Sequence, residues 1–97
     1  QVKLLPIGNE QLEYTKKIAE KMQSFGIRVE TDDRYEKIGY KIRQAQLQKI
    51  PYMLIIGDKE MADGTVSVRS RKNGDMGAVP ADEFIDRLVL EIAKKER

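Results

Sequence analysis

Two arginines, Arg69 and Arg71, alternate with a small residue in a segment that has the pattern of a β-strand, residues 65–71. Because successive side chains of a strand point to opposite faces, both guanidinium groups share one face, and Val66 and Val68 share the other. An arginine fork can donate two hydrogen bonds to the O6 and N7 edge of a guanine. On sequence alone, the commoner reason for arginines on a strand is protection of a sheet edge, so both interpretations stay open.

An acidic residue, Glu60, ends a polar segment, residues 57–60, that follows the continuous apolar run 52–56. The carboxyl ends of buried parallel strands are where open α/β sheets usually bind ligands. We expect the Glu60 carboxylate to lie in the neighbourhood of the arginines and to accept hydrogen bonds from the N–H edge of a base. The alternative is an ordinary turn in which Asp58 bonds local backbone. The segment lacks the glycine spacing and Lys-Ser/Thr ending of a phosphate loop, which disfavours an NTPase.

Basic and aromatic residues are concentrated in the middle of the chain. Residues 34–72 contain nine Lys and Arg but four Asp and Glu, although the net charge of the whole chain is only +2. A basic middle between mildly acidic ends fits a polyanion such as RNA, although solvated helix and strand faces give the same balance. Tyr35 is the best candidate for stacking on single-stranded bases, whereas Tyr40 and Tyr52 are more often core residues.

Apolar periodicity and turn residues predict eight elements in the order strand, helix, strand, helix, strand, strand, strand, helix. They are expected at residues 2–7, 10–25, 27–31, 36–48, 52–56, 65–71, 76–79 and 80–95. The apolar run of the third strand is typical of a strand covered on both faces, and Asn73-Gly74 is a strong hairpin signal. Right-handed crossovers then predict an α/β fold, a five-stranded mixed, mainly parallel sheet flanked by three helices on its two faces.

Several side chains have expected places in these elements. Asn9 is expected to cap the first helix, and Asp32 and Asp33 to form a turn or cap the second helix rather than bind a metal. Phe25 is expected on the buried face of the first helix. Lys41 is expected on the outward face of the second helix.

Length and composition exclude several classes of protein. With 97 residues, the chain is expected to form one domain over residues 1–97. It has no Cys and no His, which excludes disulfides, Cys/His zinc sites and Ser-His or Cys-His catalytic pairs. No apolar run is long enough for a bilayer and no signal peptide is apparent, so we expect a cytoplasmic protein. Without an initiator Met, the domain is expected to be excised from a longer protein.

Five motifs are spread over nearly the whole chain: Asp32-Asp33-Arg34, Gly39 to Arg43, Lys49 to Leu54, Gly57 to Glu60, and Gly64 to Arg71. Together they closely resemble bacterial threonyl-tRNA synthetases. The Asp-Asp-Arg, Gly-x-Lys and Ile-Pro elements are shared with the class II synthetase anticodon domains for proline, histidine and glycine, and they imply the fold. The Gly-Asp-Lys-Glu turn followed by Val-Ser-Val-Arg-x-Arg is more particular to the threonine enzymes.

The resemblance implies an anticodon-binding domain and gives roles to single positions. Arg69 matches the family arginine that takes the guanine edge, and Glu60 matches the acid beside it. Arg43 and Lys49 match basic positions near the anticodon, where an arginine often occurs in place of Lys49. Tyr35 stands where the family frequently has Asn, and it offers a hydroxyl and a stacking ring. The expected anticodon-binding residues are Arg69, Glu60, Arg43, Lys49, Tyr35 and Arg71.

The resemblance also implies a partner, the anticodon loop of threonine tRNA, whose second and third bases are G and U. The domain would position this tRNA for aminoacylation by a class II threonine-specific ligase whose catalytic domain is absent from this chain. No catalytic, metal or cofactor site is expected here, because ATP, magnesium and zinc belong to that absent domain. The parent is expected to be a homodimer and the isolated domain a monomer.

Two other classes of function stay open. Accessory subunits have reused the same fold as a protein-interaction domain that does not read anticodons. An α/β domain of this kind can also bind a small ligand at the carboxyl ends of its strands. Binding to RNA, and the dependence of that binding on salt, separates these classes.

Overall fold

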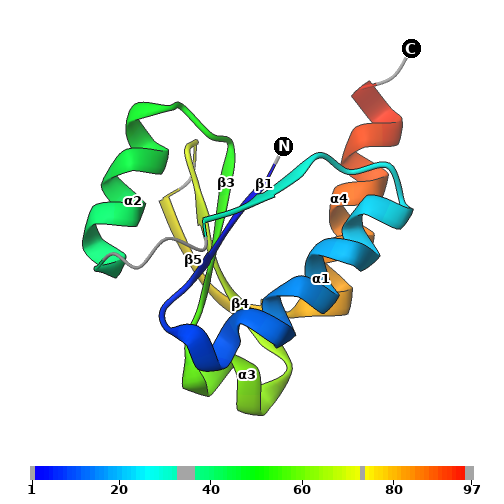
Figure 1. The fold of residues 1–97 in the computed structure, drawn as a ribbon. Coiled ribbons are helices and arrows are strands. Elements are labelled where there is room, and N and C mark those ends of the chain that lie inside the picture. The colour runs from blue at the N-terminus through cyan, green and yellow to red at the C-terminus, as the bar shows by residue number, and fades with distance from the viewer. Residues whose placement is uncertain (1, 33–36, 73, 96–97) are drawn as a thin grey trace.

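A computed structural model describes residues 2–32, 37–72 and 74–95 of the chain. The sequence predictions that concern Asp33, Tyr35 and Asn73 therefore lie outside the described residues. The described part forms one five-stranded sheet with helices on both faces (Figure 1). This arrangement confirms the predicted α/β class.

The strand order in the sheet is β2-β1-β3-β4-β5. The strands are β1 (Val2–Pro6), β2 (Val29–Thr31), β3 (Tyr52–Ile56), β4 (Thr65–Ser70) and β5 (Gly74–Pro80). β1 is parallel to both β2 and β3, whereas β4 is antiparallel to both β3 and β5. The sheet is mixed as predicted: the first three strands form its parallel part, and β4 and β5 add antiparallel pairs. Residues 57–64 are too few for a parallel crossover, which needs a dozen or more, so β4 returns antiparallel to β3.

Four helices accompany the sheet: α1 (Leu12–Ser24), α2 (Ile38–Leu47), α3 (Asp58–Asp63) and α4 (Ala81–Lys95). In Figure 1, α1 and α4 lie on one face of the sheet, α2 lies on the other, and α3 lies at one end. The three long helices were predicted, and α3 is a short fourth helix in the segment expected to be a turn. Among the described residues, no helix is both long enough and apolar enough to span a bilayer.

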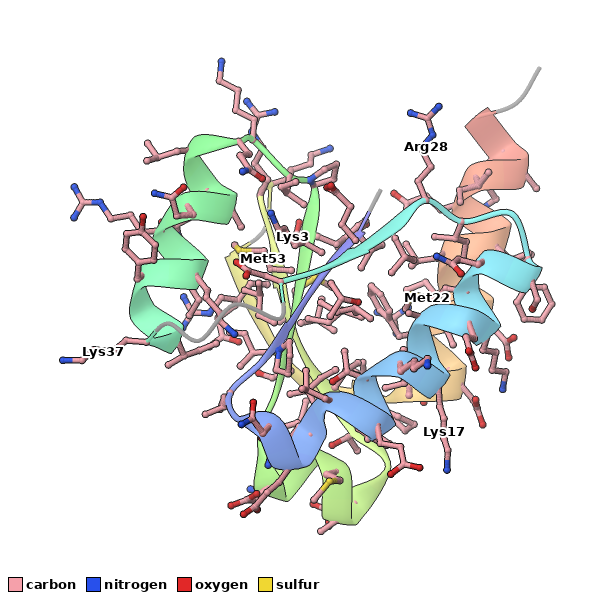
Figure 2. The ribbon with its side chains drawn as sticks, in the orientation of Figure 1. Lys3, Lys17, Met22, Arg28, Lys37 and Met53 are labelled. Atoms are coloured by element: carbon pink, nitrogen blue, oxygen red, sulfur yellow. The ribbon has the colours of Figure 1, made fainter. Side chains whose placement is uncertain are left out.

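Two hydrophobic layers hold the helices against the sheet. The larger layer lies under α1 and α4 and includes Leu4, Leu54 and Phe84, all at most 1% exposed. The smaller layer lies under α2 and consists of Leu5, Ala45 and Met53 with partly buried isoleucines. Figure 2 shows Met53 on the α2 side and Met22 on the α1 side. β1 and β3 are covered on both faces, which explains the continuous apolar sequence of β3 and the mostly apolar sequence of β1.

Lys41 is buried under α2, which corrects the prediction that it points outward. Its side chain is 3% exposed. Its Nζ donates hydrogen bonds to the carbonyl oxygens of Pro6 and Asp32, each at 3.0 Å. The Pro6 carbonyl ends β1 and the Asp32 carbonyl follows β2, and buried carbonyl oxygens need a donor. Lys41 therefore ties α2 to the carboxyl ends of two strands.

Three other predictions about single side chains are also corrected. Phe25 is 52% exposed because α1 ends at Ser24. Asn9 is not a cap: Gly8 precedes a 3-10 turn, η1 (Asn9–Gln11), and Gln11 Oε1 accepts the Gly8 N–H. Asp32 does not cap α2, whose N-cap residue is Lys37 without a side-chain cap, and the alternative of a turn at Asp32-Asp33 extends outside the described residues.

The two tyrosines expected in the core behave differently. Tyr40 is 46% exposed on α2, which corrects its predicted place. Tyr52 packs edge-on against Phe84, with ring centroids 5.5 Å apart, and its hydroxyl donates to Glu91 Oε2 at 2.9 Å. Burial and then the hydrogen bond to Glu91 raise the pKa of Tyr52. Tyr52 is therefore a packing residue, as predicted.

Candidate nucleic-acid interface

The sheet face on the α2 side is covered over β1 and β3 but open over β4 and β5. The apolar layer under α2 draws its strand residues from β1 and β3 alone, among the residues described. Farther along the same face, Ser67 of β4 pairs with Ile55 of β3 and Ala78 of β5. Ser67 is half-buried and Ala78 is exposed. An open surface therefore lies beside α2.

A cavity of about 210 Å³ lies between the end of α2 and the β4–β5 turn. Its lining residues are Gln46, Ile50, Met53, Arg69, Ser70, Arg71, Gly74 and Asp75. Arg69 pairs with Met53 across the sheet, and the Arg71 N–H donates to the carbonyl oxygen of Pro51 at 2.8 Å. The structure thus brings Arg69 and Arg71 to one cavity.

Arg43 lies on α2, on the same side of the helix as Gln46. It is exposed and precedes Gln46 by three residues, which places both side chains on one side of the helix. Gln46 lines the cavity with the arginines. Arg43 therefore adds a cation at the helix side of the same surface.

Lys49 follows Gln48, the C-cap residue of α2, and precedes Ile50, which lines the cavity. Its φ is 59°, and it is the one non-glycine residue with positive φ in the described ranges. The Lys49 N–H donates to Gln46 O and the Ile50 N–H to Ala45 O, a pair of bonds that forms a Schellman motif. Lys49 also lines a neighbouring cavity with Arg28, which Figure 2 shows at the start of β2.

Glu60 lies apart from the arginines, which corrects the prediction that all three converge. Arg69 pairs with Met53 near the start of β3, whereas Glu60 belongs to α3, beyond the end of β3. Four residues along a strand from Met53 to Gly57 span roughly 13 Å. The two sites thus lie at opposite ends of β3.

The Glu60 carboxylate is held in place by the start of its own helix. Its Oε1 accepts the backbone N–H of Gly57 at 2.8 Å, which is the one bond of a capping box that a glycine N-cap allows. Gly57 also packs so closely on Ile7 that a Cβ would lie 2.7 Å from Ile7 Cδ1. The carboxylate is therefore oriented before any ligand arrives.

Asp75 is an acid in the cavity that the sequence did not single out. It pairs directly with Arg69 across β4 and β5, next to a register shift between Val68 and Arg69. The hairpin signal at Asn73-Gly74 indicated a turn but not this pairing. Tyr35, the remaining predicted site residue, lies outside the described residues. In the described part of the chain, no cluster of three or more acidic side chains could hold a metal ion.

Comparisons with known proteins agree on one family. A family model described as "Anticodon binding domain" matches residues 1–91. The chain is 59% identical over 95 residues to the threonine–tRNA ligase of Caldanaerobacter subterraneus subsp. tengcongensis. It is 58% identical over 95 residues to that of Clostridium botulinum strain Hall. Each alignment covers 98% of this chain but only 15% of the relative.

A solved structure shares the fold. The RNA binding domain of threonyl-tRNA synthetase from Cryptosporidium parvum Iowa II superposes with a TM-score of 0.83 at 30% sequence identity. The superposition covers 90% of this chain and 22% of that chain. The likeness in fold thus extends over most of the sheet and helices described above.

Proposed function

Because the chain belongs to the anticodon binding domain family, we propose that it binds the anticodon loop of threonine tRNA. The bound tRNA is thereby positioned for aminoacylation by a threonine–tRNA ligase of which this chain is one domain. The observation that carries the proposal is the cavity that holds both Arg69 and Arg71 beside an open sheet face. The relatives that align with nearly the whole chain support the choice of threonine tRNA.

The cations around the cavity have two kinds of role. Arg69 and Arg71 can each present a fork to the O6 and N7 atoms of an unstacked guanine. Arg43 and Lys49 stand at the edges of the same surface, where phosphates of the loop would pass. These edge contacts strengthen binding without selecting a sequence.

Glu60 and Tyr35 would contact other parts of the same loop. Gly57, whose N–H the Glu60 carboxylate accepts, lies roughly 13 Å along β3 from the partner of Arg69, so Glu60 serves a different nucleotide. Its carboxylate, held by the Gly57 N–H, can accept from a base N–H edge. Tyr35 offers a ring for stacking.

The remaining assignments follow from the proposed parent enzyme. Residues 1–97 form one anticodon-binding domain of a larger protein, since the chain spans 15% of the length of its curated relatives. The larger protein is cytoplasmic. The parent is a homodimer, and the isolated domain is a monomer. ATP, magnesium and zinc are bound elsewhere in the parent, and this chain carries no catalytic site.

Binding of a threonine anticodon stem-loop at several salt concentrations tests the proposal. Affinity should fall as salt rises, and a stem-loop with the central guanine should bind more tightly than one in which adenine replaces it. Lys17→Ala serves as a control, because Lys17 points into solvent from α1, on the opposite side of the sheet from α2 (Figure 2). It should leave the guanine preference unchanged.

Three results would count against the proposal. Equal affinity with and without the central guanine would exclude base reading and leave only nonspecific RNA binding. No measurable affinity for RNA would exclude the function altogether. A specific protein partner in the absence of RNA affinity would instead support an interaction domain of the same fold.

A further inference from the structure

Arg69 and Asp75 face each other directly across β4 and β5, and both line the cavity of about 210 Å³. Residues that pair directly across antiparallel strands have Cβ atoms about 5 Å apart on the same face of the sheet. Arg69 also pairs with Met53, which lies in the apolar layer under α2, so this face is the one that opens beside α2. The cavity therefore contains one guanidinium and one carboxylate side by side.

The Asp75 carboxylate is partly oriented by its own strand. Its Oδ1 accepts the backbone N–H of Gly77 at 2.9 Å, across the register shift in β5. A carboxylate has about four acceptor positions, so this bond leaves capacity for a ligand. Arg69 and Asp75, which both belong to the described ranges, do not form an ion pair with each other. Both charged groups can thus contact a third partner in the cavity.

A carboxylate in this place determines which part of an RNA fits. A phosphate beside Asp75 would be repelled, whereas a base with N–H donors would be bound. Guanine offers acceptors at O6 and N7 and, on the adjoining edge, donors at N1 and the N2 amino group. Adenine presents a donor at N6 toward the arginine, so it does not fit the same pair of charges.

We propose that Asp75 is a specificity-determining residue that accepts a hydrogen bond from the N2 amino group of the guanine whose O6 and N7 edge Arg69 holds. The proposal rests on the proposed function, because it assumes an anticodon guanine in this cavity. Ile50 and Met53, which line the cavity with the two charged residues, contact the face of the base. Two edges of one base are read by two neighbouring strands.

Inosine in place of the central guanine tests this contact, because inosine lacks only the N2 amino group. The wild-type domain should bind the guanine stem-loop about tenfold more tightly than the inosine stem-loop, the size expected for one hydrogen bond to a charged group. Asp75→Asn should reduce this ratio to about two or less. The asparagine Oδ1 can still accept the Gly77 N–H, so the local turn is preserved.

Two further variants separate this contact from effects of charge and folding. Asp75→Glu keeps the charge but moves the carboxylate by one methylene, and it should also lower the guanine-to-inosine ratio. Glu83→Gln, on the exposed side of α4, removes one negative charge elsewhere and should keep the wild-type ratio. Thermal unfolding of each variant shows whether it is folded, and the ratio is then read from the folded ones.

The outcomes for Asp75 and for the proposed function are distinct. If wild-type protein prefers guanine to adenine but binds guanine and inosine equally, the Asp75 contact is overturned and the function stands. The same holds if both Asp75 variants keep the wild-type ratio. If wild-type protein shows no affinity for the stem-loop, the proposed function itself fails.

Discussion

The Lys49 N–H donates to the carbonyl oxygen of Gln46 at 3.1 Å, and this bond ends α2 with a lysine in the left-handed region, at φ 59°. Glycine is the usual residue at this position, because a Cβ strains the left-handed conformation. A lysine at the rim of the proposed RNA surface fits a position selected for its charge.

Lys49→Gly should therefore have opposite effects on stability and binding. We expect the free energy of unfolding to rise by roughly 0.5 kcal/mol, because relief of the strain exceeds the entropy cost of glycine. Affinity for the stem-loop should fall, and the dependence on salt should weaken by about one phosphate contact. Urea unfolding and binding at several salt concentrations give the two values. As a control, Lys49→Arg should keep both the backbone strain and the affinity for RNA. If Lys49→Gly binds RNA as tightly as wild type, Lys49 is not part of the binding site.

Arg69→Lys should lose guanine preference although it keeps the charge. A lysine ammonium cannot form the two parallel hydrogen bonds of a guanidinium, so the preference over an adenine stem-loop should fall by about 1–3 kcal/mol. Binding titrations with both stem-loops measure the preference. Arg87→Lys, on the exposed side of α4, is the matched control. A wild-type preference in Arg69→Lys would show that the fork does not read the base.

Lys41→Met should destabilise the fold. It leaves the carbonyl oxygens of Pro6 and Asp32 without their buried donor, at a cost of about 2–3 kcal/mol. Lys37→Met changes an exposed lysine of the same segment and should stay within about 0.5 kcal/mol of wild type. The midpoint and slope of urea unfolding give the free energy of unfolding of both variants. A stability equal to wild type in Lys41→Met would mean that water replaces the lost donor.

Tyr52→Phe should change how stability depends on pH. Burial and the hydrogen bond to Glu91 raise the pKa of Tyr52, so folding favours the neutral phenol. Its contribution is complete below the unfolded pKa of about 10 and is lost as pH rises through the folded value. The wild-type protein should thus exceed Tyr52→Phe in thermal stability at pH 8, by a margin that shrinks by pH 11. Glu91→Gln should also weaken the dependence of thermal stability on pH. A difference in stability between wild type and Tyr52→Phe that stays constant from pH 8 to pH 11 would contradict the prediction.

Much of the fold followed from local patterns. The continuous apolar run Tyr52–Ile56 predicted a strand covered on both faces, and that strand lies between β1 and β4. The alternation of residues 65–71 placed Arg69 and Arg71 on one face, because the side-chain period of a strand is two wherever it pairs. The family motifs extended this to an anticodon-binding domain, and the family model agrees.

The partner of Arg69 was decided only by the tertiary structure. A two-residue Asn73-Gly74 turn would have placed Ala78 opposite Arg69. In the structure Ser70 pairs with Gly74, and a register shift at Val68/Arg69 brings Asp75 opposite Arg69. The residues of β5 carry no periodic signal that sets this register, because turn length and bulge position depend on packing against the rest of the sheet.

The places of Glu60 and Lys41 were decided in the same way. Sequence proximity suggested that Glu60 lies near Arg69, but the antiparallel return of β4 puts Arg69 at the far end of β3 from α3. Lys41 has the polarity of a surface residue, yet it is buried because the carbonyls of Pro6 and Asp32 converge beneath α2. Residue types and their local spacing determined which groups were available for RNA, and the pairing of distant strands determined which of them meet.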